Sequence, residues 1–302
     1  MGRCRSGFVS VLFSVILLFG IFAAPAGGAI FYDIGVKGVY EDNVVGLLSD
    51  RSSSSPTMGS GAGTSSANVL GAMGNGPGPG GGSGTGTPSY TGSSSEKNSD
   101  MSVDILAEFG ASTRWGNNAS LLFSAAAERI AYDEFTEFNM TAGGLTVGMV
   151  WQFGGGIAAK VSASGIVKRF EDPARDSTAY GAGLLLKEFL TSRFWLKQSA
   201  GYEQNEADSA FFTYTGKSVA LGAGYGVTDR TTLFAGYSYL VREYDEPAGF
   251  EETANLFSLG LEWEVVKRWF LDLQYDRRAS DSTLPETDTT GNIYSLGARY
   301  SY

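Results

Sequence analysis

Two pairs of carboxylates stand at even spacing in the sequence, Glu262 with Glu264 and Asp272 with Asp276. On a β-strand, residues two or four positions apart project from the same face, so each pair would present both carboxylates to one side. Paired carboxylates can carry out general acid and base chemistry, as in the hydrolysis of glycosidic bonds. Hydrated wall residues of a β-barrel have the same spacing, and this structural role is the one we expect here.

Histidine is absent from the 302 residues, and the single cysteine is Cys4. The absence of histidine excludes any site in which an imidazole activates a serine or a water molecule. Oxygen ligands for Ca²⁺ or Mg²⁺ remain, and the acidic stretches 244–252 and 281–288 could supply them, but neither has the spacing of a dedicated calcium loop. We therefore expect no catalytic residue, no metal site and no cofactor.

The chain begins with a pattern typical of an export signal. Arg3 and Arg5 precede an apolar stretch at 8–24, and small residues at Ala24, Ala26 and Ala29 offer cleavage sites. We interpret residues 1–29 as a signal peptide cut near 26 or 29; the alternative is an uncleaved anchor, since about 17 apolar residues is the lower bound for a spanning helix.

Cleavage would remove Cys4 and change the charge of the chain. The basic count would fall from 22 to 20 against 32 acidic residues, so the net charge would change from −10 to −12. Such an acidic chain is a poor partner for nucleic acid, and we expect none.

Residues 50–100 form a low-complexity block rich in Gly and Ser. Such a segment buries too little apolar area to offset the entropy of ordering it. It falls within 42–100, which we expect to be a long, disordered first external loop within a barrel made of residues 30–302.

Apolar residues alternate with polar or small ones in a series of segments, as in half-buried strands. Twelve segments show this pattern, at 32–40, 103–109, 121–127, 145–151, 157–167, 180–186, 194–202, 219–225, 233–241, 257–265, 269–275 and 292–302. The connections between them are short and long in turn. The pattern predicts an all-β fold, a transmembrane antiparallel up-and-down barrel of about 12 strands. Glu188, Gln198 and Arg129 depart from it, and a bulge could turn any of them inward.

The five tryptophans fall at the ends of the segments next to the short connections. Aromatic girdles at a membrane boundary would place them there, because an amphipathic ring is stable among the headgroups. The predicted girdle is Trp115, Trp151, Trp195, Trp263 and Trp269.

With these features the chain resembles the outer-membrane β-barrels of Gram-negative bacteria, a porin-like class within which the features specify no individual family. In that class the last strand, with alternating apolar residues and a terminal aromatic, resembles the signal recognised by the outer-membrane assembly machinery. Tyr294, Leu296, Ala298, Tyr300 and Tyr302 match it. The resemblance implies a location in the outer membrane, with its lipid and that machinery as partners. The same residues also fit a strand that simply closes the barrel against 32–40.

Charged residues at the inward positions divide into two sets on opposite sides of a twelve-stranded ring. The basic wall is Lys160, Lys168, Lys187 and Lys197, and the acidic wall is Asp33, Asp104, Glu108, Glu262, Glu264, Asp272 and Asp276. The two walls could face each other across a narrow aqueous lumen and create a transverse field. They could equally meet as salt bridges that close the interior, since twelve strands lie between the filled and the open barrel sizes.

The leading functional hypothesis is a channel for passive diffusion of small polar solutes or ions. The alternatives are a closed structural or surface-display barrel whose first loop contacts a partner, an outer-membrane enzyme, and a soluble secreted β-protein. The sequence specifies neither the solute nor the oligomeric state.

Overall fold

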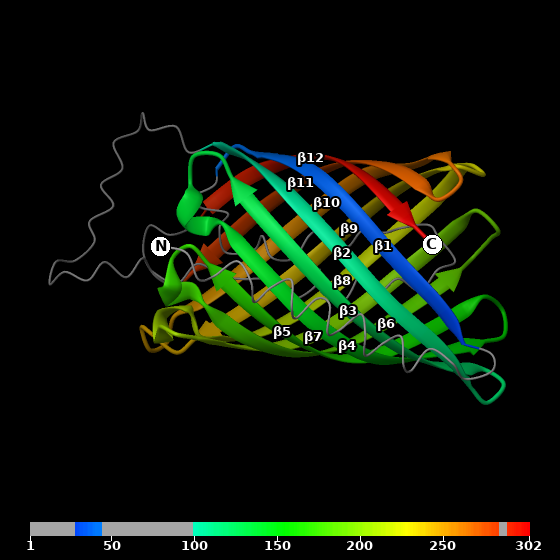
Figure 1. Ribbon diagram of the computed structural model, residues 1–302, viewed down its shortest axis with the longest axis horizontal. Coiled ribbons are helices and arrows are strands. Elements are labelled where there is room, and N and C mark those ends of the chain that lie inside the picture. Colours follow the sequence, from blue (N-terminus) through cyan, green and yellow to red (C-terminus); the bar gives the residue numbers. More distant parts are fainter. Residues whose placement is uncertain (1–27, 44–98, 284–288) are drawn as a thin grey trace, which may run out of the picture.

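The computed structural model describes residues 28–43, 99–283 and 289–302, which form one closed antiparallel β-barrel (Figure 1). The predicted signal peptide at 1–29 and the predicted first loop at 42–100 lie almost wholly outside these residues. The strands are β1 (Ala29–Glu41), β2 (Asp100–Trp115), β3 (Ala119–Tyr132), β4 (Met140–Phe153), β5 (Ile157–Phe170), β6 (Ser177–Phe189), β7 (Phe194–Ala207), β8 (Tyr214–Thr228), β9 (Thr231–Tyr244), β10 (Glu251–Val266), β11 (Trp269–Ser282) and β12 (Thr289–Ser301).

Each strand pairs with its neighbours in sequence, and β1 pairs with β12 to complete the ring. At that seam the Tyr302 amide donates to the Tyr32 carbonyl at 2.9 Å, and the Tyr32 amide donates to the Tyr302 carbonyl at 3.2 Å. Closure leaves no strand edge unpaired, which is the condition for crossing a lipid bilayer with strands. The predicted twelve-stranded barrel is thus confirmed.

Short turns gather at one end of the barrel and longer connections at the other, as predicted (Figure 1). We call these ends the inner rim and the outer rim, since short turns of such barrels are periplasmic. Three connections at the outer rim contain single-turn 3-10 helices, η1 (Thr136–Phe138), η2 (Pro173–Arg175) and η3 (Ala210–Phe212). No helix among the described residues is long and apolar enough to cross a membrane.

The two faces of the sheet differ in chemistry. The exterior carries large apolar side chains that are exposed, such as Val103 at 47%, Leu145 at 56%, Leu221 at 55% and Leu296 at 62%. The interior positions between them carry most of the buried charged residues. A water-soluble protein would lose stability with such an exterior, whereas hydrocarbon solvates it well, so the exterior is a lipid-facing surface.

Three exterior polar residues test the predicted register. Arg129 and Gln198 remain exposed on the outer face, and Glu188 is half-exposed on the same face. The register shifts in the strand pairs lie elsewhere, at Gly226/Thr228 and Glu264/Val266. A bulge therefore does not turn these three side chains inward.

Four tryptophans, Trp115, Trp151, Trp263 and Trp269, lie on the exterior near the inner rim. The assignment of Trp195 to the lipid-facing girdle was wrong, because its side chain is 4% exposed and points into the barrel. The cause is an inward glycine on the neighbouring strand. A Cβ at Gly224 would lie 2.2 Å from Trp195 Cε2, so the indole ring occupies the space above that glycine.

Two other pairs of an aromatic ring and a glycine have the same arrangement on the lumen-facing side of the sheet. The Phe234 ring covers Gly260, and the Phe31 ring covers Gly110, in each case so closely that a Cβ on the glycine would overlap the ring. Cross-strand pairs of an aromatic ring with a glycine fill gaps in the sheet and help to fix the register. These rings also narrow the lumen in its inner half.

Candidate functional site

The candidate site is the lumen, and its inner half contains an acidic cluster built around one arginine. Arg299 of β12 reaches Asp33 of β1 at 3.1 Å, Glu262 of β10 at 2.6 Å and Asp272 of β11 at 3.7 Å. Its guanidinium also lies 4.5 Å from the Phe270 ring centroid. Three carboxylates around one cation leave this cluster with a net negative charge.

The other residues of the predicted acidic wall also face inward. Asp104 lies 3.5 Å from Lys37. Asp276 accepts hydrogen bonds of 2.9 and 3.0 Å from the Gln274 amide. Glu264 accepts from the Arg268 main chain at 3.0 Å, at the inner rim, and Glu108 is buried at 2% exposure.

Opposite this wall is a lysine cluster made of Lys160 on β5, Lys187 on β6 and Lys197 on β7. Lys187 and Lys197 are directly paired in the register of β6 and β7. The Lys187 ammonium lies 4.9 Å from the Phe189 ring centroid and 4.7 Å from that of Trp195, which are favourable cation–π distances. In the ring of strands β6 and β12 are six positions apart, so the lysine cluster faces the acidic cluster across the lumen.

Lys168 faces the lumen as predicted but belongs to a different network near the outer rim. It lies 3.7 Å from Glu203, which accepts a 2.7 Å hydrogen bond from the Tyr214 hydroxyl. The Tyr214 ring lies 5.0 Å from the Arg242 guanidinium, and Arg242 lies 3.5 Å from Glu252.

This network continues to β11. Glu252 also accepts hydrogen bonds from Arg278 at 2.8 Å and from the Tyr244 hydroxyl at 3.2 Å. We call the set Lys168, Glu203, Tyr214, Arg242, Tyr244, Glu252 and Arg278 the outer belt. Its side chains come from β5 and from each of the strands from β7 to β11. Four members of the belt were not identified from the sequence: Glu203, Arg242, Glu252 and Arg278. The signal was present, because the alternation that places Val241 outward also places Arg242 inward.

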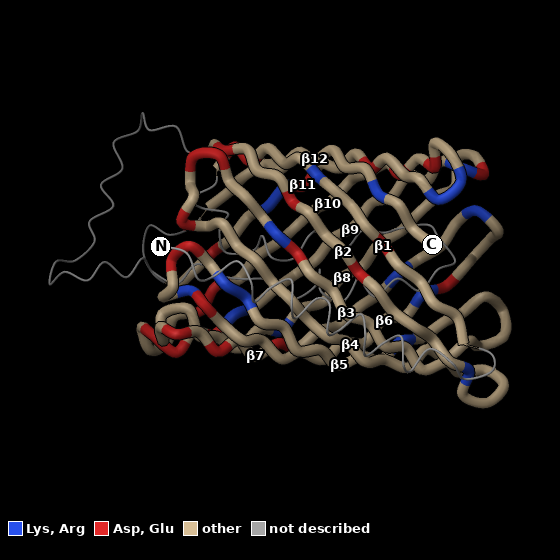
Figure 2. The backbone as a smooth tube through the Cα atoms, viewed as in Figure 1, with Lys and Arg blue, Asp and Glu red and all other residues tan. Residues whose placement is uncertain are grey.

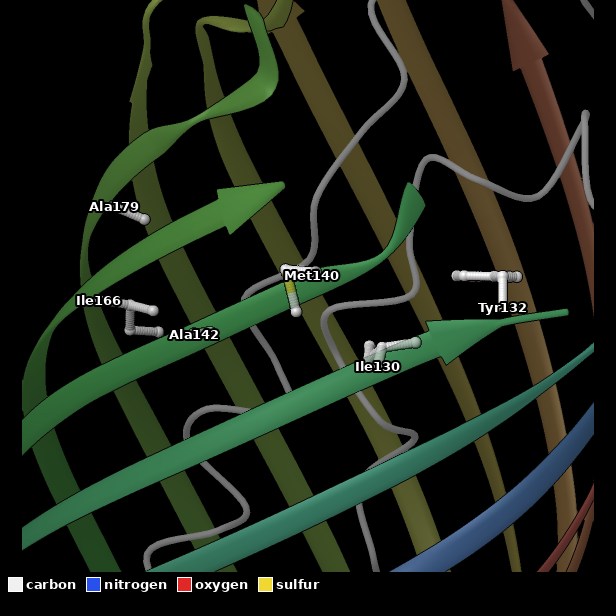
Figure 3. Packing of buried hydrophobic residues seen from close by; sticks show 6 residues of the cluster. All are labelled: Ile130, Tyr132, Met140, Ala142, Ile166 and Ala179. Atoms are coloured by element: carbon white, nitrogen blue, oxygen red, sulfur yellow. The ribbon is translucent and has the colours of Figure 1, made fainter. Parts of the chain in front are cut away.

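An apolar cluster occupies the outer half of the lumen beside the belt. Its members come from β3 to β6 and point inward toward one another (Figure 3): Ile130, Tyr132, Met140, Ala142, Ile166 and Ala179. Phe135, Phe138 and Phe170 pack against it. This part of the interior is therefore dry, whereas the wall formed by β7 to β11 is polar.

Arg175 of η2 joins three of the outer connections. Its guanidinium lies 4.6 Å from the ring centroid of Phe138, 5.5 Å from that of Phe170 and 4.9 Å from that of Phe212. Burial lowers the pKa of the Arg175 guanidinium. We call Arg175 with these three rings the outer cap.

The two rims carry opposite charge. The connections 133–139, 171–176, 208–213 and 245–250 hold nine carboxylates and one arginine. The turns 190–193, 229–230 and 267–268 hold Arg193, Arg230, Lys267 and Arg268 with one acidic residue, Asp229. Figure 2 shows the acidic residues concentrated at the end with the long connections.

The residues of the predicted assembly signal lie on the exterior of β12. Tyr294, Leu296 and Tyr302 are exposed, and Tyr300 is half-exposed. The Tyr302 ring stacks on Tyr32 with centroids 5.2 Å apart, and the Arg268 guanidinium lies 3.8 Å from its centroid. These contacts close the barrel seam; recognition by an assembly machinery stays a prediction.

No family model and no curated protein matches the chain. Among solved structures it is similar to an outer membrane channel from Pseudomonas putida F1, with 8% identity, a TM-score of 0.56, and coverage of 94% of this chain and 98% of that one. A KdgM porin gives 13% identity and a TM-score of 0.40 over 67% of this chain and 99% of its own length. The translocator domain of the autotransporter NalP from Neisseria meningitidis gives 9% identity and a TM-score of 0.41 over 97% of this chain and 95% of its own length. The first of these likenesses establishes a shared fold.

Proposed function

We propose that this chain, an outer-membrane β-barrel of the porin-like class, is a channel for passive diffusion of small polar solutes or ions. The observation that supports the proposal is the inner half of the lumen, where Lys160, Lys187 and Lys197 face the cluster of Asp33, Glu262, Asp272 and Arg299. Charged groups in a barrel interior are stable only if they are hydrated or paired. Lys160 and Lys197 are 7% and 9% exposed, so the three like charges of the lysine cluster depend on the carboxylates that face them and on water between the two walls.

The two walls would act on a solute through their field. A dipolar or zwitterionic solute that passes between a positive and a negative wall is oriented across the lumen. Small anions pass along the lysine cluster, and small cations pass along the acidic cluster. The aromatic side chains Phe31, Trp195, Phe234 and Phe270 fill part of the inner half, so we expect the passage to be narrow.

Planar-bilayer recordings test this function directly. Purified full-length protein inserted into a bilayer should give discrete conductance steps in salt solution. Protein that is fully folded, as judged by its heat-modifiable migration in detergent gels, and yet gives no conductance would rule out the channel.

A second candidate is a closed structural or surface-display barrel. The outer cap and the apolar cluster of β3 to β6 favour it, because together they fill much of the outer half of the lumen. The predicted loop 42–100 would then contact a partner. Deletion of 52–95 separates the two functions: partner binding would be lost without any change in conductance if display is the role, whereas a loop that obstructs the channel would raise conductance on deletion.

Catalysis is the weakest candidate. The chain contains no histidine, and the carboxylates of the pairs Glu262/Glu264 and Asp272/Asp276 are engaged by Arg299, the Arg268 main chain and Gln274. We propose that the protein is not an enzyme and that these pairs serve the lumen wall.

A further inference from the structure

Two arginines stand on the exterior near the outer rim, on either side of one threonine. Arg129 of β3 and Arg169 of β5 are each directly opposite Thr141 of β4 in the strand register. Their Cα atoms are therefore two strand spacings apart, about 9.5 Å. Both side chains are exposed, and the Arg169 guanidinium also donates a 3.1 Å hydrogen bond to the Lys168 carbonyl.

The pair lies at the outer boundary of the hydrocarbon. Thr141 and Trp151 are on the same strand, ten residues apart, and Trp151 marks the inner boundary. Ten residues span about 34 Å along a strand, which a tilt of about 40° reduces to about 26 Å along the membrane normal. The apolar band of such barrels is about 25 Å tall, so the arginines are level with the outer headgroups.

Exterior tyrosines away from the inner rim are absent from the same strands. They stand on β1, β6, β7, β9, β11 and β12, namely Tyr40, Tyr180, Tyr202, Tyr237, Tyr239, Tyr275 and Tyr294, and β8 and β10 also lack one. Within the strands β2 to β5 the single tyrosine, Tyr132, points inward. The outer part of β3 and β5 thus carries cations where half of the strands carry tyrosine rings.

Below Arg129 and Thr141, toward the membrane centre, small residues leave a depression in the exterior. The next row in the register is Ala107 of β2, Ala127 of β3 and Gly143 of β4, and Val167 of β5, which is 43% exposed, bounds it below Arg169. A Cβ at Gly143 would meet only the Ala126 carbonyl oxygen, 4.0 Å away, so the space above it is open. A hydrocarbon chain can lie in such a depression beneath a headgroup.

We propose that Arg129, Thr141 and Arg169 bind the phosphate of a lipid headgroup in the outer leaflet, with one acyl chain over Ala107, Ala127 and Gly143. Arginine binds phosphate through two parallel hydrogen bonds, and the threonine hydroxyl can donate a third. The ion pair of Arg169 with Asp176 does not prevent this, because it is long, at 3.6 Å, and its arginine is 59% exposed.

Lipid A is the probe, with its dephosphorylated form as the chemical control. Full-length protein is purified in detergent, incubated with either lipid and analysed by native mass spectrometry. Arg129→Ala/Arg169→Ala should bind lipid A about tenfold more weakly than the unmodified protein, the loss expected for at least one charge-assisted hydrogen bond. The control Arg277→Ala removes an exterior arginine on β11 and should bind normally.

Gly143→Leu tests the acyl position while both arginines remain, and it should also weaken lipid A binding. Heat-modifiable migration shows for every variant whether the barrel is folded, and Arg129→Lys/Arg169→Lys, which keeps the charge, should retain part of the binding. Equal binding of the dephosphorylated lipid, or unchanged binding by folded Arg129→Ala/Arg169→Ala, would overturn the proposal. Displacement of lipid A by equimolar inorganic phosphate would also overturn it, because the site would then bind free anions.

Discussion

Arg299 on β12 donates a 2.6 Å hydrogen bond to Glu262 on β10, and so reaches past the intervening strand β11. Because the same guanidinium lies 3.7 Å from Asp272 on β11, three adjacent strands depend on one cation. The contact neutralises part of the charge of the acidic wall.

Removal of that cation should change both selectivity and stability. Arg299→Gln leaves Asp33, Glu262 and Asp272 without their shared partner, so the preference of the channel for cations should rise, and the barrel should lose on the order of 3 kcal/mol of unfolding free energy. Reversal potentials in a salt gradient and urea unfolding measure the two effects. Arg299→Lys keeps the charge, so both the change in cation preference and the loss of unfolding free energy should be smaller. A normal reversal potential in Arg299→Gln would contradict the role of Arg299 in the lumen.

The lysine cluster should control the preference of the channel for anions. Lys160→Glu/Lys187→Glu makes both walls negative, and we expect the ratio of anion to cation permeability to fall about tenfold, since a unit charge about 8 Å away contributes about 2 kcal/mol at an effective dielectric constant of about 20 before screening. Lys217→Glu is the matched control, because Lys217 lies on the exterior paired with Glu243. A ratio that changes equally in both variants would exclude a lumen field.

The outer cap should limit the conductance from the outer side. Arg175→Ala removes the contact shared by Phe138, Phe170 and Phe212, which should destabilise the connections by about 2 kcal/mol and raise the conductance. Single-channel recording and limited proteolysis at 133–139 and 208–213 measure these effects. Arg175→Lys keeps the charge without the planar stacking and should give an intermediate result; unchanged proteolysis in the alanine variant would show that the cap does not hold the connections together.

The inward position of Trp195 can be tested through its glycine. Gly224→Val places carbon atoms where the indole ring lies, and should cost about 3 kcal/mol of unfolding free energy through overpacking. Trp195→Ala in the same chain should restore much of the loss, whereas Gly38→Val, on the exterior of β1, should cost little. No recovery in the double variant would mean that the ring is not above Gly224.

Tyr302 should matter more for assembly in cells than for stability. Tyr302→Ala removes one ring stacked on Tyr32, so we expect a severalfold lower amount of folded barrel in the outer membrane but a nearly normal yield on refolding in detergent. Tyr40→Ala, at the other end of the same seam against Tyr294, is the control and should reduce neither amount strongly. Equal loss in cells and in detergent would show that Tyr302 acts only through the seam.

The strands and their two faces were predictable because period-two alternation is a local property of the sequence. The inward positions of Lys160, Lys187 and Asp272 followed from it. The partners of these residues did not, since Arg299 meets Asp33 only after β12 closes on β1, and Arg175 meets Phe212 across two connections. Alternation also cannot distinguish a tryptophan at a lipid boundary from one that fills the space above a glycine, which is why Trp195 was misplaced. The extent of the strands was underestimated: β11 continues to Ser282 and β12 begins at Thr289, beyond the predicted segments 269–275 and 292–302.

The outer belt has a mechanical consequence. A hydrogen-bonded sheet resists sliding of one strand past another, but it bends easily about the strand axes, so a barrel wall alone would flatten under lateral pressure from the bilayer. The side-chain links from Lys168 to Arg278 join β5 to β11 across the inside of that curve. To flatten the wall, the bilayer would have to stretch contacts between opposite charges in a poorly hydrated interior. The belt therefore resists flattening of the outer half on the side formed by β5 to β11.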